Sequence, residues 1–229
     1  LAYYGPDGAL LTKEPDRGGK TLDPTPVFRT VWDDAGLVRV SRSADGMRAN
    51  AGNPRQVAAR TAFHTKLEFE FADGEALYGL GSHEEGVLNL RGHSQYLYQQ
   101  NRKATVPVFV STRGYGLLYA SCSFMTFHDD QYGSYIWSDA NDEMDFYVMA
   151  GRTLDDVVRV YRTLTGAAPL FPRWFFGYFQ SKERYRTGEE LVDTVREYRR
   201  RGIPIDAVVQ DWQYWPADQW GQKSFDPAR

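Results

Sequence analysis

Two segments of the sequence place polar and aromatic side chains directly after an apolar run. Residues 180–185 (QSKERY) follow the apolar segment 174–179, and residues 210–215 (QDWQYW) follow the apolar segment 205–209. In barrels and open α/β sheets, ligands bind at the carboxyl ends of the strands. If the two apolar runs are strands, these two segments are the candidate ligand-binding groups.

Asp211 has the most specific chemistry of these residues, because three tryptophans follow it: Trp212, Trp215 and Trp220. A carboxylate accepts hydrogen bonds from neighbouring hydroxyl groups of a sugar, and aromatic rings pack against the C–H faces of the same sugar. This combination favours a carbohydrate site. A hydrogen-bonded loop aspartate with its tryptophans packed in a core fits the same pattern, so position alone leaves both interpretations open.

The region that precedes these segments has the pattern of a β domain. The pair Asp7-Gly8 between apolar residues indicates a hairpin turn. Alternating apolar residues from 63 to 71 predict a strand with one buried face. Residues 41–60 are small and polar, and we expect a loop there. Many short strands with closely spaced turns predict an antiparallel β-sandwich over residues 1–152.

A helical pattern replaces the β pattern at Thr153, which is a good N-cap for an amphipathic helix that Gly166 ends. Pro169 and Pro172 then form a stiff linker to the apolar run 174–180, which suits a strand covered on both faces. A capping box at residues 187–190 begins a second helix, and 205–209 is a second buried strand. The C-terminal region is therefore predicted to be one strand–helix–strand unit.

Composition excludes several functional classes. The chain of 229 residues has 27 Lys and Arg against 30 Asp and Glu, which argues against a nucleic-acid binder with a basic stripe. No apolar run approaches the ~18 residues of a membrane span. Leu1 begins no signal-peptide pattern, which leaves open a trimmed secreted chain, periplasmic or extracellular. Cys122 is the single cysteine, so an internal disulfide and a cysteine-based zinc site are excluded.

Metal ligands are not expected in this sequence. His83 precedes Glu84 and Glu85, but adjacent residues do not share a face, and the other histidines are unpaired by spacing. We therefore predict no metal and no cofactor.

Several segments resemble glycoside hydrolase family 31. Residues 75–81 (EALYGLG), the pair Gln100-Asn101 and residues 106–116 resemble the N-terminal β-sandwich of that family. Residues 169–185 resemble the start of its (β/α)8 barrel, and residues 202–215 resemble its second barrel strand. The amino-acid sequences of these last two segments are most similar to those of the bacterial α-xylosidases that trim xyloglucan fragments.

The resemblance implies an antiparallel β-sandwich followed by the first βαβ unit of a (β/α)8 barrel. The implied boundaries are a sandwich at 1–152, a linker helix with a proline-rich segment at 153–172, and an incomplete barrel at 173–229. One βαβ unit buries too little apolar surface to form a domain, so we expect the chain to be part of a longer polypeptide that supplies the rest.

A retaining α-glycosidase is the activity that the resemblance implies. Such an enzyme acts through a nucleophile and a general acid/base, both aspartates in this family, without a metal. Both lie on later barrel strands in the family, so no catalytic residue is assigned in this chain. The expected partner is an α-linked oligosaccharide.

The resemblance to family 31 also implies which residues of this chain bind the substrate, because they match the family's motifs by position. Asp211 matches the aspartate that closes the second barrel strand and binds hydroxyl groups in the −1 subsite. Trp212 and Trp215 would line that subsite, and Trp220 its adjoining wall. Gln100 and Asn101 match a loop that the sandwich sends over the pocket, where many α-glucosidases have an acidic residue. Lys182, Glu183 and Arg184 follow the first strand. Either one of them reaches the site, or, as we expect, the Lys–Glu pair only neutralises itself at the rim.

Three functions remain to be distinguished. The first is release of α-linked xylose from xyloglucan oligosaccharides. The second is an α-glucosidase or transglucosidase of the same family. The third is a non-catalytic carbohydrate-binding β-sandwich, which would have no use for the parallel unit predicted over residues 172–215.

Overall fold

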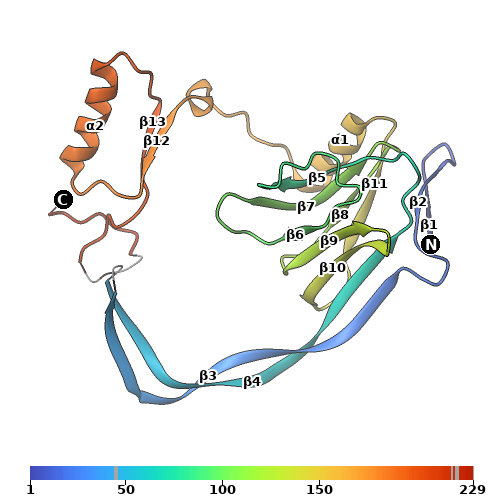
Figure 1. The fold of residues 1–229 in the computed structure, drawn as a ribbon, viewed down its shortest axis with the longest axis horizontal. Coiled ribbons are helices and arrows are strands. Elements are labelled where there is room, and N and C mark those ends of the chain that lie inside the picture. The colour runs from blue at the N-terminus through green and yellow to red at the C-terminus, as the bar shows by residue number, and fades with distance from the viewer. Residues whose placement is uncertain (44–45, 218, 220–221, 229) are drawn as a thin grey trace. The chain divides into compact units, whose positions relative to one another are not determined.

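The computed structural model describes residues 1–43, 46–217, 219 and 222–228 (Figure 1). The chain forms two compact units. Unit 1 comprises Leu1–Arg29 and Val57–Ala168, and unit 2 comprises Thr30–Gln56 and Pro169–Arg229. The boundaries predicted from the sequence, at residues 152 and 172, stay predictions.

Unit 1 is built from antiparallel sheets. One sheet has five strands in the order β3-β4-β10-β9-β6, and another has four in the order β11-β8-β7-β5. The bounds of these strands are β3 (Lys20–Ser43), β4 (Gly46–Phe69), β5 (Leu77–Ser82), β6 (Gln95–Leu97), β7 (Ala104–Ser111), β8 (Tyr115–Tyr119), β9 (Met125–Asp130), β10 (Gly133–Asn141) and β11 (Phe146–Ala150). This antiparallel β-rich fold agrees with the sequence prediction.

The core of unit 1 draws apolar side chains from both sheets. Leu67 and Phe69 of β4 and Phe127 of β9 are buried together with Phe109 and Leu117 of the four-stranded sheet. Phe69 and Phe109 meet edge to face, with ring centroids 6.0 Å apart. The two sheets therefore face each other as the layers of a sandwich.

Two local predictions for unit 1 are confirmed. Strands β1 (Ala2–Tyr4) and β2 (Leu10–Lys13) form an antiparallel hairpin, and Gly8 in their turn adopts a positive φ of 78° that favours glycine. Along β4, Thr65, Leu67 and Phe69 are buried while the residues between them are not, as the alternation predicts.

The loop predicted at residues 41–60 is wrong for the described residues. Strand β3 continues to Ser43 and β4 begins at Gly46, so most of this segment is a long two-stranded ribbon. Val38, Val40 and Met47 on this ribbon are all exposed. None of the side chains whose burial is described between residues 41 and 60 is buried, so no core selects for apolar alternation there, and alternation is the signal by which strands are recognised.

Helix α1 (Leu154–Thr165) covers one sheet of the sandwich. The Thr153 side chain accepts a hydrogen bond from the Asp156 backbone N–H, and the Asp156 side chain accepts one from the Thr153 N–H, which makes a capping box. Val157 is buried against Val108 of β7 and Met149 of β11. The predicted helix is thus present, and it packs on the four-stranded sheet.

Unit 2 contains a parallel strand pair joined by a helix. Strand β12 (Phe179–Lys182) pairs with β13 (Ala207–Gln210), and α2 (Gly188–Arg200) lies between them in the chain. The strand predicted to begin at residue 174 begins five residues later, because Arg173–Phe176 form a 3₁₀ turn, η1. That this unit opens a (β/α)8 barrel stays a prediction.

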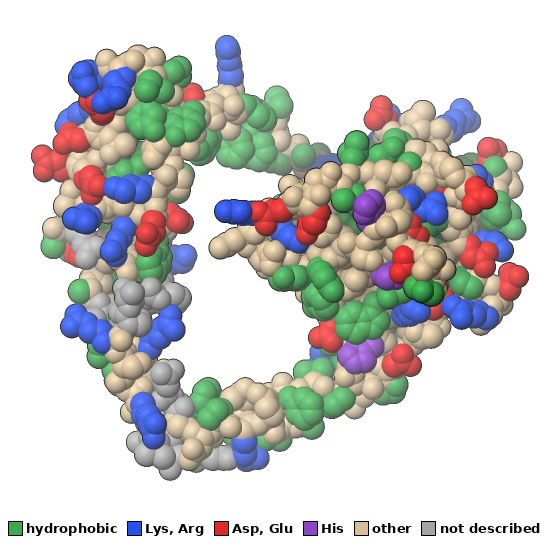
Figure 2. Space-filling view, in the orientation of Figure 1, with side chains coloured by type: hydrophobic (Ala, Val, Ile, Leu, Met, Phe, Trp, Pro, Cys, Tyr) green, Lys and Arg blue, Asp and Glu red, His purple; other side chains and the backbone are tan. Residues whose placement is uncertain are grey.

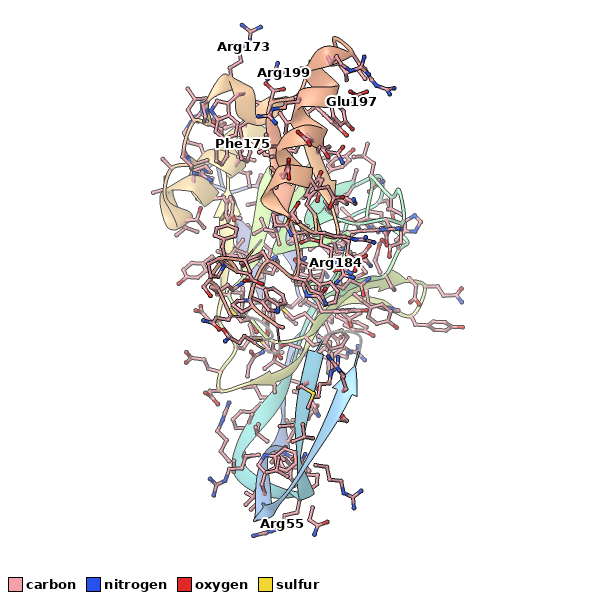
Figure 3. The ribbon with its side chains drawn as sticks, turned by 90° about the vertical axis from the view of Figure 1, so that its left-hand side faces the viewer. Arg55, Arg173, Phe175, Arg184, Glu197 and Arg199 are labelled. Carbon is pink, nitrogen blue, oxygen red and sulfur yellow. The ribbon has the colours of Figure 1, made fainter. Side chains whose placement is uncertain are left out.

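Helix α2 begins with half of the predicted capping box. The Thr187 side chain accepts a hydrogen bond from the Glu190 N–H at 3.1 Å, but the Glu190 carboxylate accepts from the Arg186 N–H at 2.7 Å. Near the end of the helix, Arg199 donates to the Ile205 carbonyl at 2.7 Å and fixes the segment that leads into β13 (Figure 3). None of the described helices is both long and apolar enough to span a bilayer.

Apolar side chains that precede and begin β12 are open to solvent. Trp174, Phe176 and Tyr178 are all exposed, and Phe179 on β12 and Val209 on β13 are only about two-thirds covered. Figure 3 shows Arg173 of η1 extending away from the ribbon. The expectation of strands covered on both faces is therefore wrong within the described residues, where α2 is the helix that packs on this pair.

Candidate ligand-binding site

The carboxyl ends of β12 and β13 lie side by side. Their register pairs Lys182, the last residue of β12, with Gln210, the last residue of β13. The segments that follow each strand therefore leave the sheet at the same edge. This is the edge at which α/β proteins bind ligands.

Gln210 ties these two segments together. Its Oε1 accepts a hydrogen bond from the Tyr185 N–H at 3.0 Å, and its Nε2 donates to the Tyr185 carbonyl at 3.4 Å and to the Trp212 carbonyl at 3.0 Å. One amide thus holds backbone from both strand ends. Sequence reasoning missed this role, although a long polar side chain that ends an apolar strand is a signal for it.

The aspartates at the two ends of β13 have different surroundings. At the amino end, Asp206 accepts a hydrogen bond from the Tyr178 N–H at 3.0 Å. A Cβ on Gly177 would lie 1.9 Å from its Oδ2, so only glycine fits there. At the carboxyl end, Asp211 is exposed, and no hydrogen bond or ion pair joins its carboxylate to another described residue. The Asp206 carboxylate already accepts a backbone hydrogen bond, whereas the exposed Asp211 carboxylate can accept hydrogen bonds from a ligand.

Aromatic rings gather directly after Asp211. Trp212 and Trp215 meet edge to face at 6.4 Å between centroids, and Tyr214 lies 5.3 Å from Trp215 and 5.2 Å from Phe225. Trp215 is buried, while Trp212 and Tyr214 are partly exposed. The structure thus brings the Trp212 and Trp215 rings together, directly after Asp211 in the chain, whereas Trp220 lies outside the described residues.

The charged residues after β12 are arranged around Glu190. Lys182 Nζ lies 2.8 Å from Glu190 Oε1 and 5.3 Å from the centre of the Tyr185 ring. The pKa of Glu190 is lowered, first by the hydrogen bond from Lys182 and then by the one from the Arg186 N–H. Lys182 is therefore neutralised by Glu190 of α2 and not by its neighbour Glu183. Figure 3 shows Arg184 in the same segment.

Tyr185 lies in a segment that the sequence marks as a candidate, but sequence reasoning gave this residue no role of its own. Its ring is buried, and within the described part of the chain its hydroxyl group has no hydrogen-bond partner. A buried hydroxyl without a partner is costly. Its place directly after an apolar strand was the only signal in the sequence.

Gln100 and Asn101 belong to unit 1, whereas the residues described above belong to unit 2. They lie in the exposed loop between β6 and β7, in a turn where the Lys103 N–H donates to the Gln100 carbonyl at 3.2 Å. Their contact with substrate stays a prediction.

The chemistry of the cluster suits an uncharged, hydroxyl-bearing ligand. An exposed carboxylate accepts hydroxyl hydrogen bonds, and the rings after it offer apolar surface. A cavity of 570 Å³ lined by Arg173, Trp174, Phe176, Gly177 and Asp206 lies instead beside the amino ends of the strands. Within the described residues, no group of three or more His, Cys, Asp or Glu side chains is placed to hold a metal ion.

Comparison with protein families finds one match in the C-terminal part of the chain. Residues 168–229 match the TIM-barrel domain of the glycosyl hydrolases family 31. This segment contains β12, α2 and β13 together with every candidate site residue of unit 2.

Two curated proteins are similar to the chain in sequence. An α-xylosidase from Saccharolobus solfataricus is 39% identical over 175 residues, which is 72% of this chain and 24% of that protein. An uncharacterized family 31 glucosidase from Pseudescherichia vulneris is 36% identical over 234 residues, covering 100% of this chain and 41% of that protein. The chain therefore spans less than half the length of these relatives.

The fold is similar to that of a solved structure. A family 31 α-xylosidase from Xanthomonas citri superimposes with a TM-score of 0.72 over 99% of this chain and 38% of its own, at 19% identity. At that identity the likeness concerns the fold alone.

Proposed function

We propose, from the premise that this chain belongs to glycoside hydrolase family 31, that it is part of a retaining α-glycosidase that releases α-linked xylose from xyloglucan oligosaccharides. The observation that carries the proposal is the exposed Asp211 carboxylate at the carboxyl end of β13, followed by the ring cluster of Trp212 and Trp215. The α-xylosidase relative supports xylose as the sugar that is released.

The strand–helix–strand unit is proposed to open a (β/α)8 barrel. Three observations support this: the parallel β12–β13 pair, the match of residues 168–229 to a TIM-barrel domain, and the apolar residues 174–179, much of whose surface is exposed. Further strands and helices of a barrel would cover such surface.

The part of this chain in the reaction is to bind and orient the substrate. Retention needs two carboxyl groups about 5–5.5 Å apart, one a nucleophile and the other a general acid and then base. As the family resemblance implies, both would lie on later barrel strands. Asp211 would accept hydrogen bonds from sugar hydroxyls, the rings would exclude water from one side of the sugar, and Gln210 would keep the two strand-end segments in place.

Replacement of Asp211 in the full-length protein tests the proposal. The Asp211 carboxylate would accept hydrogen bonds from two sugar hydroxyls, and each charge-assisted bond contributes roughly 1.5–3 kcal/mol. Since ~1.4 kcal/mol is tenfold in rate, Asp211→Ala should lower kcat/KM by about two to four orders of magnitude. Asp211→Asn should lose less, because its shape and one acceptor remain. Asp206→Asn is the matched control, because it changes the aspartate at the other end of β13 and should leave kcat/KM within a few-fold of wild type.

Two outcomes would contradict the site assignment. One is an Asp211→Ala protein with nearly wild-type kcat/KM. The other is a loss of activity that is explained entirely by unfolding, because an exposed strand-end side chain should support little packing. The aromatic cluster would then be assigned to core packing.

A second function is favoured by the family 31 glucosidase relative, which matches the whole chain. In that case the protein is an α-glucosidase or transglucosidase. The ratio of kcat/KM for aryl α-xylosides and aryl α-glucosides distinguishes the two, and a ratio in favour of the glucosides would overturn the xylosidase assignment. A non-catalytic carbohydrate-binding sandwich would hydrolyse neither.

A further inference from the structure

A groove of 620 Å³ lies on the outer face of the five-stranded sheet in unit 1, far along the chain from Asp211. Its lining residues come from four strands of that sheet and the residue before β6: Lys66, Ser94, Gln95, Tyr96, Thr126, His128, Tyr135 and Trp137. Figure 2 shows hydrophobic and histidine side chains beside one another where Figure 1 places β9 and β10. The volume is that of an ordinary ligand site.

The strand register arranges the groove. Trp137 of β10 pairs with Thr126 of β9, and Thr126 pairs with Tyr96 of β6. These three residues therefore form one row across the sheet, with a small side chain between two large rings. Since neighbouring strands lie about 4.8 Å apart, the backbones that carry the two rings are about 9.6 Å apart, with Thr126 between them.

Further rings hold the walls of the groove in place. Phe124 lies 6.1 Å from Trp137, edge to face, and 6.1 Å from Tyr96, stacked. In the next row, Tyr135 stacks on His128 at 4.7 Å. Tyr96 is 61% exposed and Trp137 partly exposed, so these rings are not core residues.

The polar groups of the groove are uncharged or neutralised. His128 Nδ1 is hydrogen-bonded to Ser94 Oγ at 2.7 Å, and its Nε2 lies 3.0 Å from Asp130. Lys66 is paired with Glu68 at 2.5 Å and lies 4.5 Å from the centre of the Tyr135 ring. No carboxylate lines the groove among the described residues. This chemistry disfavours an ionic ligand and favours one with apolar faces and hydroxyl edges.

A peptide strand is a poor fit for the same place. The strands beneath the groove, β9 and β10, are each paired on both sides, so their backbone groups are already used. Strand addition needs an unpaired edge, and among the strands that line the groove this edge belongs to β6, which is only three residues long. Over β9 and β10 a ligand is therefore recognised by side chains, through rings and hydroxyl or imidazole groups.

We propose that this groove is a second carbohydrate-binding site, which takes an uncharged, extended oligosaccharide with one sugar ring against Trp137 and another against Tyr96. The spacing of the two rings requires at least two linked sugars. The identity of the sugar rests on the proposed function: the β-1,4-linked glucan backbone of xyloglucan fragments is extended, uncharged and flat on both faces.

Binding measured on the 229-residue chain tests this inference. We expect saturable binding of a β-1,4-linked glucan tetrasaccharide by titration calorimetry, and at least tenfold weaker binding of glucose. Trp137→Ala and Tyr96→Ala should each weaken tetrasaccharide binding about tenfold or more, because a ring in the centre of a contact supplies a large part of its area. Tyr147→Ala is the matched control: Tyr147 is an exposed tyrosine of β11, in the other sheet, and its loss should leave the affinity unchanged.

Several outcomes would overturn the second site. One is the absence of saturable tetrasaccharide binding. Another is an affinity in the Trp137 and Tyr96 variants equal to that of the wild type. A third is a self-association that both variants abolish, without any sugar binding, which would show that a second copy covers the groove. If Trp137→Ala fails to fold, Tyr96→Ala decides, since so exposed a ring contributes little to stability. Hydrolysis by the Asp211 variants of the full-length protein is a separate measurement, so failure of the groove would leave the proposed function standing.

Discussion

At the residue scale, the two aspartates at the ends of β13 have different roles: Asp206 has a structural role and Asp211 is proposed to bind the ligand. Asp206 holds the Tyr178 N–H, while Asp211 has an exposed carboxylate with no described partner. A typical hydrogen bond contributes about 1 kcal/mol net, or roughly fivefold in an equilibrium. Asp206→Ala should therefore speed amide exchange at Tyr178 about fivefold, measured by NMR, and Asp211→Ala should leave it unchanged. Equal exchange in both variants would contradict this assignment.

Glu190 gives a second prediction at this scale, in its response to pH. Its pKa is lowered by hydrogen bonds from Lys182 and the Arg186 N–H. A carboxyl group with a lowered folded-state pKa stabilises the fold above its ordinary pKa, and this contribution is lost as the pH falls through the folded-state value. An NMR titration should find the Glu190 midpoint below that of an unstructured glutamate. Lys182→Met should move the midpoint upward, and an unchanged midpoint would show that this ion pair does not form in solution.

At the element scale, strand β4 was predictable where it has a buried face and was missed where none of its described side chains is buried. The alternation of Thr65, Leu67 and Phe69 predicted β4 because the sandwich core selects for it. The same strand was missed before residue 60, where it belongs to an exposed ribbon. The position of Asp211 at a strand end followed from the apolar run before it. The Gln210 amide bonds did not, because they join two segments whose proximity only the parallel pairing creates.

The same contrast predicts how strongly the elements are protected from exchange. Residues 65–69 of β4 lie on a core shared by two sheets, whereas Phe179 of β12 and Val209 of β13 stay about one-third exposed. Amides that open locally exchange according to the apolar contacts that hold them. In the 229-residue chain, the amides of β12 should exchange faster than those of β4 at residues 65–69. Protection of β12 equal to that of β4 would mean that unit 2 is stable without further covering elements.

At the scale of the whole molecule, the last prediction concerns activity. The chain spans 24% and 41% of the lengths of the two relatives described above, and we propose that both catalytic carboxylates lie on barrel strands after β13. Each of these groups supplies roughly two to four orders of magnitude in rate. The 229-residue chain should therefore not hydrolyse aryl α-xylosides or aryl α-glucosides above a blank expression control. The full-length protein, assayed in parallel, should hydrolyse these substrates. Its Asp211→Ala variant should do so with the lower kcat/KM given above. The contrary result is turnover by the short chain that persists through purification and is abolished by substituting one of its own carboxylates. That result would place the catalytic pair among residues 1–229 and overturn the proposal that this chain only binds and orients the substrate.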